Sequence, residues 1–299
     1  MDRVPGQTNY LMEKRLRECD PGLHRRFTDT VITMQNALFR FRRLFPEFTD
    51  HSALHSMTVI DFCNRLIGPE QMQLLNADAI YVLLMSCYLH DVGMGISEEQ
   101  FREFSKEIDF GDYPEKHPQA GIPAIVRDFH QEFSAAFVRK YADLLEIPTS
   151  EHAFAIVQVC RGHRKTDLFD TGQFPPDFAV PGGHEIFLPY LSALIRLADE
   201  IDVMAARNPK MLYDMESFTD DHEIAYHKRH LAVKDLLVTD DAFTMQVVRA
   251  DPKTNAMVDD LAGKMQKTLD LCRAAAEAGS PFQIRQKQVN MVVMGRESI

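Results

Sequence analysis

The chain has 299 residues, of which 45% are hydrophobic and 26% charged, an ordinary composition for a soluble globular protein. Its net charge of −11 argues against broad nucleic-acid binding, because neutralising phosphates needs a basic surface, but leaves room for a local basic pocket. The sequence shows neither a signal-peptide core at its N-terminus nor the roughly 18 uninterrupted apolar residues of a membrane span. Its 5 scattered cysteines fall mostly in apolar helical patterns and have no C-x-x-C pair. We therefore predict buried thiols in a soluble, cytoplasmic protein that binds no membrane.

The chain up to residue 207 has the apolar periodicity of helices. A helix that begins near Leu23 carries apolar residues at intervals of three and four, and Pro46 ends it. The next predicted helix covers 52–67 and ends at Gly68-Pro69, since glycine and proline together are a strong stop signal.

A central helix is predicted at 77–90. Asn76 can cap its N-terminus, and apolar residues on nearly every face indicate that other helices surround it. Ser97 and Gln100 have the spacing of a capping box, which starts a short amphipathic helix through about Ile108.

Loops rich in glycine and proline separate the remaining helices of the array. We expect helices at 121–145, 151–163 and 184–207, with Pro189 in the first turns of the last one. The segment 166–183 is expected to be an irregular loop.

After Asn208-Pro209 the composition shifts toward short runs rich in valine and leucine. These runs predict a hairpin of 230–238 with 242–249, an amphipathic helix at 255–278 and a closing strand within 282–294. The predicted fold is mainly α, with a helical array over 1–207 and a small α+β lobe over 208–299.

The dyad His90-Asp91, at the end of the apolar helix, is the most informative feature of the sequence. An imidazole and a carboxylate on adjacent residues place two metal-binding groups on one turn of backbone. Further candidate ligands lie on either side at intervals of about 33 to 39 residues, which suits one ligand per helix: His55, His130, His163 and Asp199.

These candidate ligands stand where a polar side chain needs a partner. His55 and His130 share helix faces with apolar residues, and Asp199 follows an apolar run. A buried carboxylate such as Asp91 costs roughly several kcal/mol without a cation or donors. A pair of metal ions satisfies all of these groups most simply. Nitrogen and oxygen donors without thiolate favour Mn, Fe, Co, Ni, Zn or Mg.

The ordered set H…HD…H…H…D resembles the HD superfamily of metal-dependent phosphohydrolases. The matching segments are LHSMTV at 54–59, LHDVGM at 89–94, RDFHQEFSAAFV at 127–138, VCRGHR at 159–164 and RLADEID at 196–202. Within the superfamily the chain is most similar to the HD domains called HD-CE, which often accompany heat-shock-type ATPase modules. The chain itself carries no ATPase signature.

The resemblance implies an HD-domain helical array with a dinuclear metal centre. One divalent ion would be held by His55, His90, Asp91 and Asp199, and Asp91 would bridge to a second ion bound by His130 and His163. The implied reaction is hydrolysis of a phosphate ester or anhydride, of a nucleotide or cyclic nucleotide, by a metal-bridging hydroxide. The small-molecule phosphate substrate and the identity of the two ions stay open.

Several specialised HD families are not matched. Met94 stands where domains that hydrolyse cyclic dinucleotides have a lysine, and no G-Y-P signature follows the histidines. The histidine-rich motif of dNTP triphosphohydrolases and the E-D pair of (p)ppGpp hydrolases are also missing.

Basic residues surround His163 and are the best candidates for binding substrate phosphate. Arg161, Arg164 and Lys165 are predicted to act in catalysis beside Asp91, by steadying the charge of the phosphate during transfer. The alternative is a solvated helix end, where the helix dipole favours cations.

Other polar residues have open roles. Arg196 is expected to pair with Glu200, and Asp202 to cap or ion-pair. His51 is a ligand, a supporting group or surface, and His117 a proton donor on a lid or surface. The tract DHEIAYHKRH is expected to form a polar surface helix that carries His222, His227 and His230.

Three functions suit this ligand set. The leading one is a phosphohydrolase, because the basic cluster near His163 suits a phosphate substrate. The second is an HD-type di-iron oxygenase resembling myo-inositol oxygenase. The third is a non-catalytic, nucleotide-sensing HD module, against which the complete ligand set argues. The C-terminal lobe has no chemical motif, and the partners considered are a second copy of the chain, as a homodimer, or an ATPase.

Overall fold

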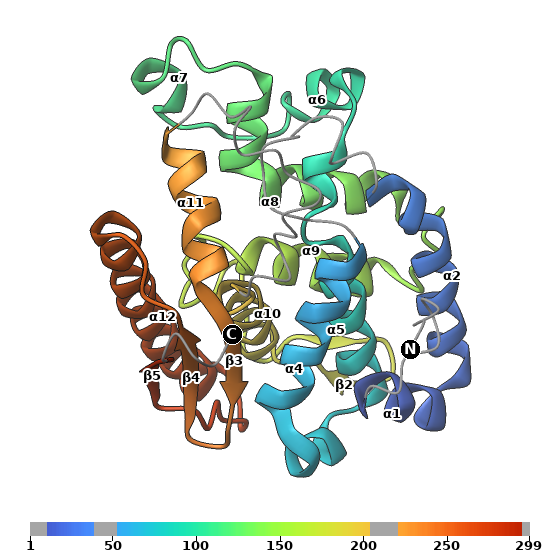
Figure 1. The fold of residues 1–299 in the computed structure, drawn as a ribbon. Coiled ribbons are helices and arrows are strands. Elements are labelled where there is room, and N and C mark those ends of the chain that lie inside the picture. The colour runs from blue at the N-terminus through green and yellow to red at the C-terminus, as the bar shows by residue number, and fades with distance from the viewer. Residues whose placement is uncertain (1–10, 39–52, 204–220, 295–299) are drawn as a thin grey trace.

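The computed structural model describes residues 11–38, 53–203 and 221–294, and it is mainly helical (Figure 1). The array before residue 204 has these elements: α1 Leu11–Cys19, α2 Pro21–Leu38, α4 Ala53–Leu74, α5 Ala77–Leu89, the 3₁₀ helix η1 Val92–Gly95, α6 Glu98–Phe104, α7 Tyr113–Lys116, α8 Ile122–Tyr141, α9 Ser150–Gly162, β1 Ala179–Val180, β2 His184–Glu185 and α10 Leu188–Glu200. The predicted fold class, mainly α with a small α+β lobe, is confirmed.

Helix α5 packs against α1, α2, α4, α9 and α10, as its uniformly apolar sequence predicts (Figure 1). Every residue from Asp78 to Leu89 is buried. Asn76 caps the helix as expected, because its Oδ1 accepts a hydrogen bond from the backbone N–H of Ala79 at 2.8 Å. Within the described ranges, no single helix is both long and apolar enough to cross a membrane.

Element α4 consists of two helices that meet at the predicted stop signal Gly68-Pro69. Gly68 has a φ of 72°, which breaks the helical path, and the chain then resumes a helix to Leu74. A side chain at Gly68 would be strained and would collide with the guanidinium of Arg285. The predicted helix end at Gly68 is therefore confirmed, and a second helix from Pro69 to Leu74, which the sequence analysis did not predict, follows across a kink.

The segment before α10 also differs from the prediction. His184 was expected to begin the last helix, but it lies in β2, which pairs antiparallel with β1 inside the expected loop 166–183. Pro189 lies in the first turn of α10, as predicted. Pro46, and the helix end predicted there, lie outside the described residues.

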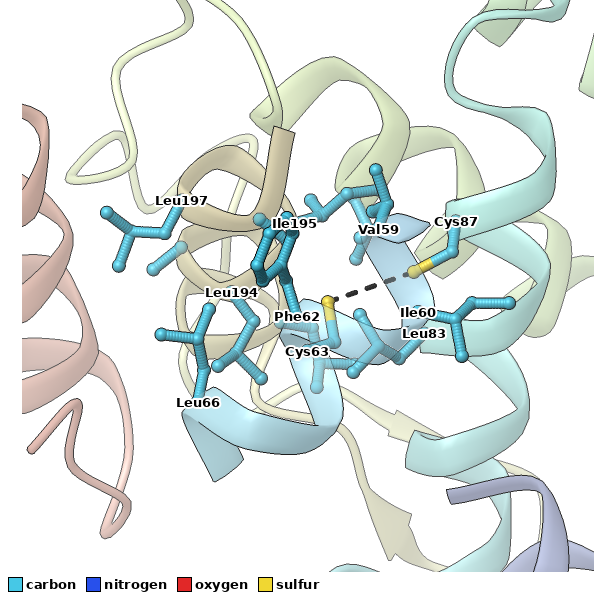
Figure 2. Close-up of a cluster of buried hydrophobic side chains, with 14 of the residues drawn as sticks. Val59, Ile60, Phe62, Cys63, Leu66, Leu83, Cys87, Leu194, Ile195 and Leu197 are labelled. Atoms are coloured by element: carbon cyan, nitrogen blue, oxygen red, sulfur yellow. Dashed lines mark hydrogen bonds between the residues drawn. The ribbon is translucent and has the colours of Figure 1, made fainter. Parts of the chain in front are cut away.

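A continuous hydrophobic core connects α4, α5 and α10 (Figure 2). Val59 and Leu66 of α4 pack there against Leu83 of α5 and Leu194 of α10. Four of the five cysteines are buried free thiols, as the sequence predicts, and Cys19 is exposed: the buried ones are Cys63, Cys87, Cys160 and Cys272.

The C-terminal lobe combines helices with a three-stranded sheet. Its elements are α11 Asp221–Ala232, β3 Val233–Val238, β4 Ala242–Val247, α12 Pro252–Gly279 and β5 Gln288–Val293. β3 pairs antiparallel with β4, which confirms the hairpin, and β5 pairs parallel with β4. The chain returns from β4 to β5 through α12, because parallel strands need a long crossover.

The lobe and the helical array share one hydrophobic core. Helix α12 packs along α10, and the rings of Tyr190 and Phe282 stack with their centroids 5.0 Å apart. The division into domains 1–207 and 208–299 stays a prediction, and its boundary lies outside the described residues.

Candidate metal centre

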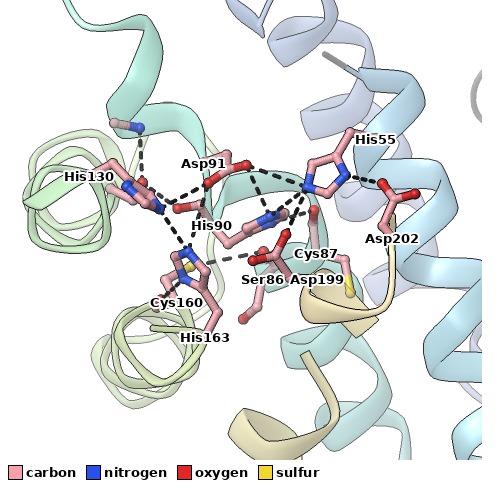
Figure 3. Close-up of polar contacts among 12 residues, drawn as sticks. His55, Ser86, Cys87, His90, Asp91, His130, Cys160, His163, Asp199 and Asp202 are labelled. Carbon is pink, nitrogen blue, oxygen red and sulfur yellow. Dashed lines mark hydrogen bonds and ion pairs between the residues drawn. The ribbon is translucent and has the colours of Figure 1, made fainter. Parts of the chain in front are cut away.

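The six predicted ligands come from five helices or their ends and converge on one region of the array (Figure 3). Five of them are buried and the sixth is partly exposed. They are His55 in the first turn of α4, His90 at the end of α5, Asp91 directly after it, His130 in α8, His163 at the end of α9 and the partly exposed Asp199 in the last turn of α10.

The first group of ligand atoms belongs to His55, His90 and Asp199, and these atoms all lie within 4.8 Å of one another. Nε2 of His55 is 3.3 Å from Nε2 of His90 and 3.3 Å from Oδ1 of Asp199. Two ligands that each lie about 2.1 Å from one ion are roughly 3 to 3.5 Å apart, so the spacing suits a shared ion.

The second group belongs to Asp91, His130 and His163, again with all ligand atoms within 4.8 Å. Nε2 of His130 is 3.0 Å from Nε2 of His163 and 3.3 Å from Oδ1 of Asp91. The structure therefore brings the six predicted ligands together as two groups of three.

The carboxylate of Asp91 lies between the two groups (Figure 3). Its Oδ1 faces His130, whereas its Oδ2 is 3.3 Å from Nε2 of His90 and 3.5 Å from Nε2 of His55. One carboxylate with an oxygen toward each group has the geometry of a bridging ligand.

Backbone carbonyls set the tautomer of three of the histidines. A carbonyl oxygen only accepts, so the ring nitrogen facing it carries the proton and Nε2 turns a lone pair to the centre. Each acceptor lies three residues before its ring: His90 Nδ1 donates to Cys87 O at 3.0 Å, His130 Nδ1 to Arg127 O at 2.7 Å, and His163 Nδ1 to Cys160 O.

The fourth ring is oriented by a side chain. Nδ1 of His55 lies 2.6 Å from Oδ2 of Asp202. Asp202 was expected to cap or ion-pair, but it accepts a hydrogen bond from His55, a candidate ligand. Sequence reasoning missed this connection, although Asp202 follows Asp199 by a single helical turn.

The donor set fits a bound cation. Nε2 of His130 and Nε2 of His163 lie 3.0 Å apart, yet both rings carry their proton on Nδ1, so neither nitrogen can donate to the other. Burial, with the nearby rings of His90 and His130, holds the pKa of His163 well below its ordinary value. A neutral imidazole with an inward lone pair is the form that binds a metal ion.

The predicted basic residues separate in space. Arg164 lines a pocket of about 140 Å³ that opens onto Asp91, His130 and Asp199. Lys165 lines an adjoining pocket of about 210 Å³, together with His163. Arg164 and Lys165 therefore both line pockets that also contain candidate metal ligands.

Arg161 lies elsewhere. Its Nε and Nη2 donate to Oε2 of Glu132 at 2.8 and 2.6 Å, and its side chain lines a different pocket of about 650 Å³ between α8 and α9. The structure does not bring Arg161 to the candidate metal centre, so the expectation that it acts beside Asp91 gains no support.

The expected pair of Arg196 with Glu200 is wrong. Arg196 donates from Nε to the carbonyl of Gly162 at 2.7 Å and from Nη2 to that of Thr166 at 2.6 Å. Glu200 pairs instead with Lys264 of α12 at 2.9 Å.

The remaining histidines divide between core and surface. His230 was expected on the surface, but it is 1% exposed and contacts the carbonyl of Val203 through Nδ1 at 3.0 Å. His117 is exposed, and its ring lies against Tyr113 with centroids 4.4 Å apart. The side chains of His51, His222 and His227 lie outside the described residues.

The C-terminal lobe covers one side of the pocket over Asp91. Arg229 and His230 of α11 line this pocket, as do Leu261 and Lys264 of α12. No motif in the sequence indicated this role, because these residues lie far along the chain from the six ligands.

Comparison with known proteins agrees with this geometry. The HD-CE family model matches residues 45–277, which is most of the chain and includes all six candidate ligands. No curated protein and no solved structure matches significantly. The chain belongs to the HD-CE family.

Proposed function

We propose that the protein is a metal-dependent phosphohydrolase that cleaves a phosphate ester or anhydride of a nucleotide or cyclic nucleotide. The observation that carries the proposal is the carboxylate of Asp91, which turns one oxygen to each of two groups of ligands. A carboxylate shared in this way suits two neighbouring divalent ions, and paired ions suit phosphoryl transfer.

The residues of the chain would divide between the two ions. His55, His90 and Asp199 would bind one ion, His130 and His163 the other, and Asp91 both. Bound ions of this kind lower the pKa of water toward neutrality and stabilise charge on phosphoryl oxygens. The hydrogen bonds on the four Nδ1 atoms keep the Nε2 lone pairs directed inward, which prepares the site before any ligand arrives.

The cations around the centre support phosphate as the reacting group. Arg164 lines the pocket over Asp91 and His130, and Lys264 reaches the same pocket from α12. Cations there attract a phosphate and offset the charge that develops during transfer. An uncharged substrate of a di-iron oxygenase would offer these groups no anionic partner.

The proposal is tested with protein purified without added metal. We expect elemental analysis to find two equivalents of divalent metal per chain. With Mn, Fe, Co, Ni, Zn or Mg, we expect phosphate release or ester cleavage from at least one member of a panel of nucleoside phosphates, cyclic nucleotides and bis(p-nitrophenyl) phosphate.

Asp91→Asn should lose metal from both groups and lower turnover by roughly 100-fold or more. Asp260→Asn is the matched control, since it makes the same chemical change at an exposed position on α12. Iron content with oxygen-dependent turnover and no phosphate release would overturn the proposal in favour of an oxygenase. Nucleotide binding without any turnover would overturn it in favour of a sensor.

A further inference from the structure

A buried arginine beside the candidate metal centre makes no direct ion pair with a carboxylate among the described residues, although Asp167 is near enough to interact with its charge. Arg196 is 9% exposed, and its described hydrogen bonds go to the carbonyls of Gly162 and Thr166. Carbonyl groups hold the guanidinium in place but do not balance its charge. A buried charge without a directly bound counterion is costly, and Asp167 offsets it only from a distance, so this position is favoured when an anion binds nearby.

Arg196 lines the pocket of about 210 Å³ next to the candidate metal centre, and further cations line it too. Arg164 and Lys165 reach it from the segment after α9, and Lys264 reaches it from α12. Its two carboxylates are Asp199, a candidate metal ligand, and Glu200, which pairs with Lys264. The cations outnumber the carboxylates, and a bound metal ion would offset the charge of Asp199 as well.

This pocket adjoins the one over the metal centre. Arg164, Asp199, Glu200 and Lys264 line both. An anionic group beside Arg196 would therefore lie next to a phosphate held over Asp91. Two phosphates that share a bridging oxygen can span two such neighbouring positions.

We propose that the pocket of Arg164, Lys165, Arg196 and Lys264 binds a second phosphate group of the substrate, which makes phosphoanhydrides the preferred substrate class. This inference rests on the proposed phosphohydrolase function and narrows it. Arg196 contributes most, because its guanidinium is buried and already oriented, whereas the Lys264 side chain is 64% exposed. In the hydrolysis, the oxygen of water bonds to the phosphorus over Asp91 and the bridging P–O bond breaks. The oxygen of the leaving phosphate keeps the electron pair of the broken bond in this pocket. One proton of the water passes to solvent, and the other stays on the phosphate formed over Asp91.

Binding without turnover tests the pocket. Methylenediphosphonate carries two phosphonate groups and resists hydrolysis at its bridge, and methylphosphonate carries one. Calorimetry is done on the full chain as purified, without excess metal. We expect the diphosphonate to bind at least about 10-fold more tightly, since charge-assisted hydrogen bonds of this kind contribute strongly. Equal affinity for the two anions would overturn the inference.

Variants on α12, on α10 and after α9 test whether the preference for the diphosphonate comes from the pocket that Arg196 lines. Lys264→Gln should weaken diphosphonate binding about 3- to 10-fold and, because Lys264 lines both pockets, should weaken methylphosphonate binding as well. Lys165→Gln, at a residue that lines only the second of these pockets, should weaken diphosphonate binding and leave methylphosphonate binding unchanged. Lys267→Gln is the matched control, because it lies on the same helix, is exposed and lines neither pocket. Glu200→Gln removes a negative charge and should tighten diphosphonate binding. Equal effects of the Lys264 and Lys267 variants would contradict the assignment.

Arg196→Gln should cause the largest loss of diphosphonate affinity. Because its side chain also holds two backbone carbonyls, circular dichroism must show that this variant folds, and the Lys264 and Glu200 variants decide the question if it does not. The two proposals fail separately. Selective diphosphonate binding without any hydrolysis would refute only the proposed function, and hydrolysis with no preference for a second phosphate would refute only this pocket.

Discussion

Single hydrogen bonds orient the rings of the candidate metal centre. Three histidines donate to main-chain carbonyls, and no side-chain substitution removes those partners. His55 differs because its partner is the carboxylate of Asp202. Of the four hydrogen bonds, only the one to Asp202 can therefore be removed by a point substitution that leaves all six candidate ligands in place.

We expect Asp202→Asn to weaken metal binding about 10- to 100-fold, because the neutral amide holds the His55 ring less firmly and makes it a weaker ligand. Competition with a chromogenic chelator measures the affinity. Asp260→Asn, at an exposed site, should leave it unchanged. Equal metal affinities in the two variants would show that Asp202 does not support the site.

The five thiols differ sharply in exposure, which predicts one reactive cysteine. Burial raises the pKa of Cys272 to about 12 and raises that of Cys87 and Cys160 far above the ordinary value, whereas Cys19 is exposed. A disulfide reagent at pH 8 should therefore titrate about one thiol rapidly in native protein and all 5 in denaturant. Cys19→Ser should remove the rapid phase, and a rapid phase that survives it would contradict the buried placement of the others.

At the scale of elements, the turn after the dyad is held against α8. The N–H of Gly93 donates to Oγ of Ser134 at 2.9 Å, and this hydroxyl donates to the carbonyl of His90 at 2.6 Å. A Cβ on Gly93 would collide with the carbonyl of His130. The missing side chain therefore lets η1 approach α8 closely enough to bring the dyad beside His130.

Two glycine substitutions should have opposite effects on stability. Gly93→Ala should lower the free energy of unfolding by about 1–3 kcal/mol, because it overpacks the contact of η1 with α8. Gly263→Ala, in α12 with open space around it, should raise it by about 0.5–1 kcal/mol through better helix propensity. Urea unfolding of the metal-free protein measures both, and a stabilising Gly93→Ala would show that the turn is not close-packed.

At the scale of the whole molecule, the centre joins segments that are distant in sequence. His55 and Asp202 are in contact although 147 positions separate them, and the other ligands come from α5, α8, α9 and α10. Because the unfolded chain cannot keep these groups together, a metal ion binds the folded protein far better than the unfolded one.

Metal should therefore stabilise the fold as a whole. At 100 times the dissociation constant, metal should add about 2.7 kcal/mol to the free energy of unfolding and raise the melting temperature by several degrees. Thermal scans with and without a chelator measure the difference. Asp91→Asn should show no such difference, and a metal-dependent shift of wild-type size in that variant would contradict the proposed ligand set.

Much of the fold was predictable because its signals are local. The uniformly apolar sequence of α5 is visible residue by residue. Its Asn76 cap involves neighbours within one turn, and so does the capping box at Ser97, which the structure contains. The ligand set could also be predicted from the sequence, because its residue types and spacing hardly depend on which helices pack together. The helix that follows Gly68-Pro69 as far as Leu74 was missed, because a local stop signal does not reveal whether a new helix begins directly after it.

The sequence by itself determined the helical class, the lobe and the six residues that could hold metal, since each depends on residue type and short-range pattern. Only the tertiary structure decided which cations face the centre. Arg161 lies on α9 and turns to Glu132, whereas Arg164 and Lys165 follow the helix end, where helical periodicity no longer predicts direction. Packing of α11 and α12 over the centre likewise buries His230 and places Lys264 at the pocket. The sequence could not predict either placement, because contacts between distant segments leave no periodic pattern in either segment.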